Sequence, residues 1–177
     1  VHNVLGPGDR YFNTGDLIRE VDVGFAFFQR HYQFVDRTGD TFRWKGENCS
    51  TNEVAEQLNS FPAVASANVY GVEIPGTNGR AGMAALHLQE ESFDLDAFSA
   101  HVEGALPSYA RPIFLRIQHD QETTSTFKLV KKTLREEGYD LAKVGGDSLF
   151  VLKPGSSTYE PLTAAYLDTI MAGDAGF

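Results

Sequence analysis

Three short segments hold the residues whose types could do chemistry. They are YFNTGDL at 11–17, FVDRTGDTFRWKGEN at 34–48 and TTSTFKLVKKTLREEG at 123–138. The first offers the carboxylate of Asp16, the second the guanidinium of Arg37, and the third the ammonium of Lys128, in a turn rich in threonine and serine. A carboxylate accepts paired hydrogen bonds from a vicinal diol, a guanidinium donates in a planar fork, and a positioned ammonium stabilises developing negative charge.

Each segment also has a purely structural explanation when it stands alone. A TGD sequence is a common turn, because Asp and Gly close loops readily, and Asp16 then serves only that turn. Arg37 could form a surface ion pair with Asp36 or Asp40. Lys128 could simply lie at a solvated helix start.

Composition limits the class of protein. The 177 residues suffice for one domain, or one domain plus part of another. The acidic balance, 24 Asp and Glu against 15 Lys and Arg, argues against a sequence-independent nucleic-acid binder. The lone Cys49 excludes an intramolecular disulfide framework and favours a reducing compartment, and its expected role is packing or surface. The histidines have no metal-ligand spacing, so we predict no metal site, and neither a membrane span nor a leader is expected.

The first half of the chain predicts strands and then a helix. Residues 1–17 show no helical period and no strand long enough to start a hydrophobic core, which is typical of the end of a larger domain. Residues 17–37 predict two or three antiparallel strands. Residues 41–45 predict a short strand and residues 46–48 a turn. The capping-box spacing of Ser50 and Glu53 then predicts a helix from about Thr51 to Asn59.

The second half predicts further strands and helices in irregular alternation. We expect strands over 63–74, 81–89, 113–118 and 148–153, helices over 95–106 and 129–138, and a final helix beginning at Pro161. On the 129–138 helix, Lys131, Lys132 and Arg135 are expected on the solvated face. The order predicts an α+β fold, a small mixed sheet with flanking helices, preceded by a few antiparallel strands from the end of a larger domain.

In this order and spacing, the segments resemble the C-terminal part of adenylate-forming enzymes. The closer resemblance is to the very-long-chain acyl-CoA synthetase and fatty acid transport protein branch, through RTGDTFRWKGEN, PIFLR, the TFK turn and a closing helix ending in MAGD. The resemblance covers nearly the whole chain. It implies that residues 1–38 are the last strands of an N-terminal domain and that residues 39–177 form a mobile C-terminal catalytic domain.

The implied activity is that of an AMP-forming, ATP-dependent acid–thiol ligase. The carboxylate of a long-chain fatty acid attacks the α-phosphate of ATP, and the thiol of CoA then displaces AMP from the acyl-adenylate. ATP, Mg²⁺ and CoA are expected in the full-length enzyme, and none is expected to bind the fragment alone, which should be inactive. Its expected partners are its own N-terminal domain and the substrates, fatty acid and CoA. The expected location is cytoplasmic, with the missing part as a route to membrane association.

The resemblance also implies residue roles. Lys128 is the catalytic lysine, which contacts the carboxylate and the α-phosphate during adenylation. Asp16 binds the ribose of the nucleotide, and Arg37 its ribose and phosphate. The hinge falls at Gly39 or Asp40, because relatives carry Asp or Lys two residues after the arginine and this chain has Gly39 there.

A second loop is implied for the thioester step, at Trp44, Lys45 and Gly46. A glycine at position 46 lets the backbone pass close to the pantetheine arm of CoA. Trp44 is expected to pack, and Lys45 either meets a CoA phosphate or is only a solvated cation.

Other functions remain open at this point. The chain could belong to a fatty acid uptake or transport protein, to an aryl- or short-chain acyl-CoA ligase, to a peptide-synthetase adenylation domain, or to a module that binds an adenine nucleotide without catalysis. No segment identified here contacts the acyl group, so chain length follows only from the branch resemblance.

Overall fold

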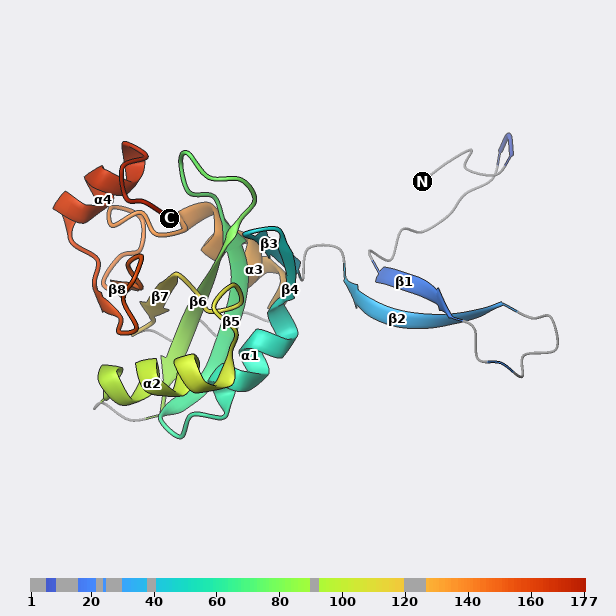
Figure 1. The fold of residues 1–177 in the computed structure, drawn as a ribbon, viewed down its shortest axis with the longest axis horizontal. Coiled ribbons are helices and arrows are strands. Elements are labelled where there is room, and N and C mark those ends of the chain that lie inside the picture. The colour runs from blue at the N-terminus through green and yellow to red at the C-terminus, as the bar shows by residue number, and fades with distance from the viewer. Residues whose placement is uncertain are drawn as a thin grey trace. The chain divides into compact units, whose positions relative to one another are not determined.

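The computed structural model divides the chain into two compact units, Val1–Thr41 and Phe42–Phe177 (Figure 1). It describes residues 6–8, 16–21, 24, 30–37, 41–89, 93–119 and 127–177. Among these, the side chains of residues 16, 17, 19, 33–37 and 127–130 lie outside the description. The assignment of residues 1–38 to the end of a larger domain stays a prediction.

The described part of the first unit contains a pair of antiparallel strands, as its sequence predicts. Strand β1 spans Asp16–Val21 and β2 spans His31–Arg37. The register places Asp16 opposite Arg37 and Val21 opposite His31, with an irregularity between Leu17 and Ile18.

The second unit is built on a mixed sheet, which confirms the predicted α+β fold. Five strands lie in the order β5 (Val64–Val72), β6 (Ala81–Leu88), β7 (Phe114–Ile117), β8 (Ser148–Val151) and β9 (Glu160–Pro161). All neighbours are antiparallel except β6 and β7, which are parallel. Parallel neighbours need a long crossover, and helix α2 (Leu95–Ala105) lies within it.

Helix α1 (Thr51–Asn59) has the predicted bounds and cap. The Ser50 hydroxyl accepts a hydrogen bond from the Glu53 backbone N–H at 3.3 Å, which satisfies one of the free donors of the first turn. Val54 and Leu58 are buried on its inner face. The local signal was sufficient here because cap and apolar period agree.

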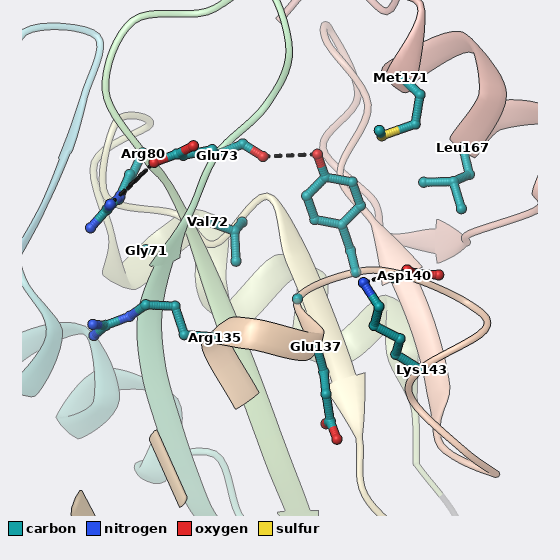
Figure 2. A pocket seen from close by; sticks show the side chains of 12 residues that line it. Gly71, Val72, Glu73, Arg80, Arg135, Glu137, Asp140, Lys143, Leu167 and Met171 are labelled. Carbon is teal, nitrogen blue, oxygen red and sulfur yellow. Dashed lines mark hydrogen bonds and ion pairs between the residues drawn. The ribbon is translucent and has the colours of Figure 1, made fainter. Parts of the chain in front are cut away.

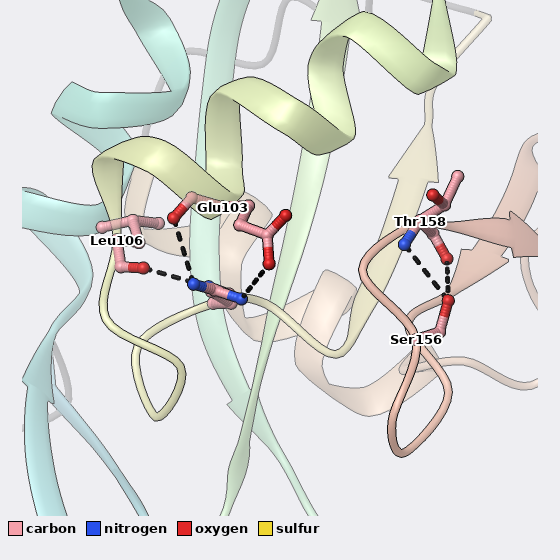
Figure 3. Close-up of polar contacts among 5 residues, drawn as sticks. Glu103, Leu106, Ser156 and Thr158 are labelled. Atoms are coloured by element: carbon pink, nitrogen blue, oxygen red, sulfur yellow. Dashed lines mark hydrogen bonds and ion pairs between the residues drawn. The ribbon is translucent and has the colours of Figure 1, made fainter.

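Helix α2 is closed at both ends by side chains. Asp94 accepts from the Ala97 N–H at 2.9 Å at its start. At its end, Arg111 donates to the carbonyl oxygens of Glu103 and Leu106, both at 3.0 Å, and to the Glu103 carboxylate at 3.3 Å (Figure 3). A cation is favourable there because the last carbonyls carry partial negative charge.

Two helices begin elsewhere than predicted. Helix α3 spans Phe127–Glu137, so Lys128 lies in its first turn and not in the turn before a helix starting at residue 129. Helix α4 spans Ala164–Met171 and is capped by Thr163, whose hydroxyl accepts from the Tyr166 N–H at 3.2 Å. The prediction that Pro161 begins this helix is wrong. Proline lies instead on the outermost strand β9, where its missing N–H leaves no ladder bond unmade. None of the helices in the described ranges is long and apolar enough to cross a bilayer.

A small hairpin docks on the large sheet through glycine positions. Its strands are β3 (Thr41–Trp44) and β4 (Glu47–Ser50). The Phe42 side chain lies against Gly71 and Gly82, which are cross-strand partners. A Cβ on either glycine would come within 2.8 Å of Phe42. Only glycine at these positions leaves room for the ring.

The same hairpin meets the connection between β5 and β6. Trp44 forms an isolated bridge with Gly79, and the Arg80 N–H donates to the Arg43 carbonyl oxygen at 2.7 Å. These backbone contacts and the buried Phe42 ring fix the hairpin to the sheet.

Replacing Gly79 by alanine should destabilise the chain more than replacing Gly76 in the same connection. Both glycines have positive φ, 91° and 78°, so backbone strain should lower the free energy of unfolding by about 1–2 kcal/mol in either variant. At position 79 the new Cβ would also overlap the Arg43 carbonyl oxygen, which should add about 1–3 kcal/mol. Urea unfolding followed by circular dichroism measures both. Equal losses would contradict the proposed constraint.

Candidate functional site

The thioester loop predicted from the sequence is the tip of the docked hairpin. Lys45 and Gly46 form the two-residue turn between β3 and β4, with φ of 49° and 88°. Positive φ at both central residues matches the twist of a tight hairpin. The predicted turn at 46–48 therefore begins one residue too late. Trp44 is 2% exposed and belongs to the core, whereas Lys45 and Gly46 are exposed.

The two residues predicted to bind the nucleotide face each other on the backbone. Asp16 opens β1, Arg37 closes β2, and the two are Cα partners. The backbone register thus places these two residues opposite each other at one end of the ladder. The predicted hinge residues, Gly39 and Asp40, lie outside the described residues.

Lys128 is placed by the backbone of α3 alone. It is the second residue of the helix, in the first turn, and its side chain lies outside the described part. Its role in adenylation stays a prediction. What the structure does describe in detail is how the other end of α3 is held.

A buried guanidinium holds that end. Arg116, on β7, is 6% exposed, and it donates from Nη1 to Glu137 Oε2 and from Nε to Asp147 Oδ2, both at 2.5 Å. Glu137 is the last residue of α3, and Asp147 precedes β8. Burial by itself would lower the pKa of Arg116, but the hydrogen bonds to Glu137 and Asp147, together with the negative charges of these two carboxylates, outweigh burial and raise the pKa.

An aromatic contact reinforces the same end. Tyr139, two residues after α3, stacks on Phe114 with ring centroids 4.1 Å apart and planes 9° from parallel. Its hydroxyl donates to the Glu73 carbonyl oxygen at 2.8 Å, which joins it to the end of β5. Burial raises the pKa of Tyr139, so the hydroxyl stays a donor over a wider pH range.

The hairpin and the C-terminal end of α3 lie on opposite faces of β5. A Cβ on Gly71 would point at Phe42 of the hairpin, whereas the neighbouring Val72 side chain points at Gly138, just after α3. Successive residues of a strand face opposite sides, so the two contacts are on different faces. The domain therefore has two distinct candidate working faces.

The sequence reasoning missed the Arg116 cluster. The available signal was an arginine within the apolar strand IFLRIQ, because arginine is rarely buried unless it is paired. Its partners lie 21 and 31 residues away, so spacing alone could not identify them.

The prediction for the basic face of α3 holds only in part. Lys132 and Arg135 are exposed, but Lys131 is half-buried, and its ammonium lies 3.5 Å from the hydroxyl of the buried Thr51. The solvated-face prediction is wrong for Lys131, because α3 lies close enough to the start of α1 for this contact.

A pocket lies beyond the C-terminal end of α3. Its volume is about 540 Å³, and it is lined by the end of β5, by residues 137–140 and by α4 (Figure 2). The charged groups at its rim include two ion pairs, Arg80 with Glu73 at 3.1 Å and Lys143 with Asp140 at 2.9 Å. The predicted site residues whose side chains the structure describes, Trp44, Lys45 and Gly46, do not line it, and we assign it no part in the predicted reaction.

Cys49 has a packing role. The residue is 4% exposed, and its Sγ donates to the Tyr109 carbonyl oxygen at 3.6 Å. Burial, followed by the nearby Glu47 carboxylate, raises the pKa of the thiol from 9.0 to about 11. The neutral thiol is the stable form in the folded chain.

Folding should therefore protect Cys49 from thiol reagents. At pH 8 the native chain should react with a disulfide reagent far more slowly than the urea-unfolded chain, because the thiolate is the reactive species. The raised pKa of Cys49 also contributes to the free energy of unfolding. This contribution should be fully present below pH 9.0 and should be lost as the pH rises toward about 11, because the thiol of the unfolded chain ionises first. Equal reactivity of the native and unfolded chains at pH 8 would contradict the burial of the thiol.

Substitutions at the two residues of the hairpin tip should change the free energy of unfolding differently. Lys45→Gly should leave the free energy of unfolding unchanged or raise it by up to about 1 kcal/mol, because glycine accepts the left-handed backbone. Gly46→Ala should lower it by about 1–2 kcal/mol for the converse reason. Thermal and urea unfolding of both variants measure this. A large loss in Lys45→Gly would mean that the lysine side chain supports the hairpin.

Comparison with known proteins identifies the family. Residues 53–128 match the family described as AMP-binding enzyme C-terminal domain. The chain is 47% identical over 173 residues to long-chain fatty acid transport protein 3 of Homo sapiens, covering 97% of this chain and 24% of that protein. It is 42% identical over 165 residues to the very long-chain fatty acid transport protein of Cochliobolus heterostrophus, covering 91% of this chain and 25% of that protein.

A solved structure agrees on the fold. Coronafacic acid ligase from Pectobacterium brasiliense superposes with a TM-score of 0.57 at 22% identity, covering 84% of this chain and 27% of that one. The chain thus spans about a quarter of the length of the relatives it matches. Residues 53–128 therefore belong to the AMP-binding enzyme C-terminal domain family, and nearly the whole chain is similar to part of the long-chain and very long-chain fatty acid transport proteins.

Proposed function

We propose that this chain is the C-terminal part of a fatty acyl-CoA ligase. The longer protein would join a long-chain fatty acid to AMP with release of pyrophosphate, and then transfer the acyl group to the thiol of CoA with release of AMP. The observation that carries the proposal is 42–47% identity, over nearly the whole chain, to fatty acid transport proteins, together with the match of residues 53–128 to an AMP-binding enzyme C-terminal domain. The pivot would lie at Gly39 or Asp40.

In the adenylation step, Lys128 would supply positive charge. Attack of a carboxylate on a phosphate brings two anions together, so negative charge grows at phosphorus in the transition state. An ammonium fixed at that point stabilises the charge as it develops. The start of a helix suits this task, because the following turns hold the lysine backbone in one direction.

The nucleotide would be held by the first unit. The carboxylate of Asp16 would accept from the ribose hydroxyls, and the guanidinium of Arg37 would donate to ribose and phosphate. Their register on β1 and β2 supports this assignment, because one ligand could meet both residues at the same end of the ladder. Mg²⁺ would be held by residues of the N-terminal domain, where it would neutralise phosphate charge.

In the thioester step, the hairpin tip would approach CoA. Gly46 lacks a side chain and so leaves room for the pantetheine arm, while Lys45 offers an exposed cation to a phosphate. The hairpin and the C-terminal end of α3 lie on opposite faces of β5. A rotation of the domain between the steps would bring first Lys128 and then the hairpin tip to a common substrate.

A second candidate is a role in fatty acid uptake, favoured by the names of the relatives. Activation to acyl-CoA would trap an imported acid, so the two functions are compatible in one protein. The domain described here would then lie on the cytoplasmic side, where ATP and CoA are available, and any membrane attachment would come from another part of the protein.

A lysine variant of the full-length protein tests the ligase. Lys128→Ala should slow ATP–pyrophosphate exchange with a long-chain fatty acid by about 10²- to 10³-fold, because transition-state charge loses its partner. Lys132→Ala is the matched control. Lys132 lies on the same helix, is exposed and pairs only loosely with Glu136 at 3.7 Å, so its loss should change the rate less than about twofold. Similar rates for the two variants would contradict the assigned role of Lys128.

A further inference from the structure

We propose that Arg116 is a positioning residue for the adenylation step. By holding Glu137, it sets the direction of helix α3, whose first turn carries Lys128. This inference rests on the proposed function, and it adds a residue on β7 that would act on the reaction through α3.

The contact between Arg116 and Glu137 joins the sheet to helix α3. Arg116 lies on β7, the middle strand of the five, and Glu137 is the last residue of α3. Their 2.5 Å hydrogen bond is charge-assisted and shielded from water, since the Arg116 side chain is 8% exposed. A planar guanidinium fixes the direction of its partners as well as their distance.

A helix held at one end moves most at the other end when it tilts. Lys128 and Glu137 are nine positions apart on α3, which corresponds to about 14 Å along the helix axis. A tilt of about 5° at the anchored end would move the first turn by about 1 Å, and a misplacement of that size can slow a reaction by about 10²-fold.

Two other contacts of α3, at Leu134 and at Lys131, fix the direction of the helix less well. Leu134 is buried and holds the helix against the core, but an apolar contact has little directional preference. The Lys131 ammonium lies 3.5 Å from the Thr51 hydroxyl, at the limit of a hydrogen bond. The hydrogen bond between Arg116 and Glu137 is shorter and more directional than either of these two contacts.

Asp147 provides a matched comparison. It accepts from the same guanidinium at the same 2.5 Å distance, but it lies before β8 and not on α3. Its other carboxylate oxygen accepts from the His119 N–H at 3.1 Å. Loss of Asp147 should loosen the sheet side of the cluster and leave the link to the helix in place.

The test compares Glu137→Ala with Asp147→Ala in the full-length protein, with each half-reaction measured separately. Glu137→Ala should slow ATP–pyrophosphate exchange by about 10- to 100-fold. Transfer of the acyl group from supplied acyl-adenylate to CoA should change by less than about threefold, because the hairpin is fixed to the sheet by its own contacts at Gly71, Gly82 and Gly79 and not through Glu137. Asp147→Ala should leave both half-reactions within about threefold of the unmodified protein.

Two outcomes would overturn the inference. Equal slowing of both half-reactions in Glu137→Ala would indicate a general structural role, and unchanged exchange would show that the anchor does not reach Lys128. Should Glu137→Ala fail to fold, Glu137→Gln keeps the side-chain volume and a weaker acceptor, and it should still slow exchange more than transfer.

Amide hydrogen exchange provides a readout that does not depend on activity. Glu137→Ala should speed exchange at the amides of residues 131–137 more than Asp147→Ala does. Equal effects would overturn the inference even if the unmodified protein proved unable to activate fatty acids. If the unmodified protein showed no pyrophosphate exchange with any fatty acid, this result would count against the proposed function.

Discussion

The domain depends on one buried cation shared by two carboxylates. Arg116 has to be desolvated to lie within the sheet, and desolvation of a charge is unfavourable unless hydrogen-bonded partners compensate. Glu137 and Asp147 provide those partners from two segments distant in sequence, so the sheet, helix α3 and the approach to β8 are joined at one point. Nearby, the buried Tyr70 hydroxyl lacks a hydrogen-bond partner among the described residues.

The second constraint is steric. Phe42 can pack against the sheet only because glycine occupies both facing positions, 71 and 82, and this contact helps to fix the hairpin with its exposed tip. The ion cluster and the glycine contact lie in the same unit and attach to one sheet. A sheet that carries the hairpin on one face and the C-terminal end of α3 on the other would suit the proposed reorientation of the domain between two chemical steps. Such a reorientation would require a stiff domain and a flexible boundary.

Features that neighbouring residues determine could be predicted from the sequence, whereas features that depend on distant segments could not. Helix α1 was predicted to the residue because its cap and its apolar period lie within ten positions. The starts of α3 and α4 were misplaced because a threonine-rich approach and a proline each allow more than one local outcome. In the case of Pro161 an edge position in the sheet decided the matter. The Arg116 cluster, the burial of Cys49 and the contact of Lys131 with Thr51 depend on segments that meet only in the folded chain. No window of sequence contains them.

The most direct measurement is a crystal structure of the full-length protein bound to a stable analogue of a fatty acyl-adenylate. The account predicts the Lys128 ammonium at about 3 Å from an oxygen of the carboxyl or α-phosphate group. It also predicts the Asp16 carboxylate on the ribose hydroxyls, with the contact between Arg116 and Glu137 intact. A structure in which the adenylate is bound and enclosed, but Lys128 remains remote from it while another cation occupies that position, would contradict the account.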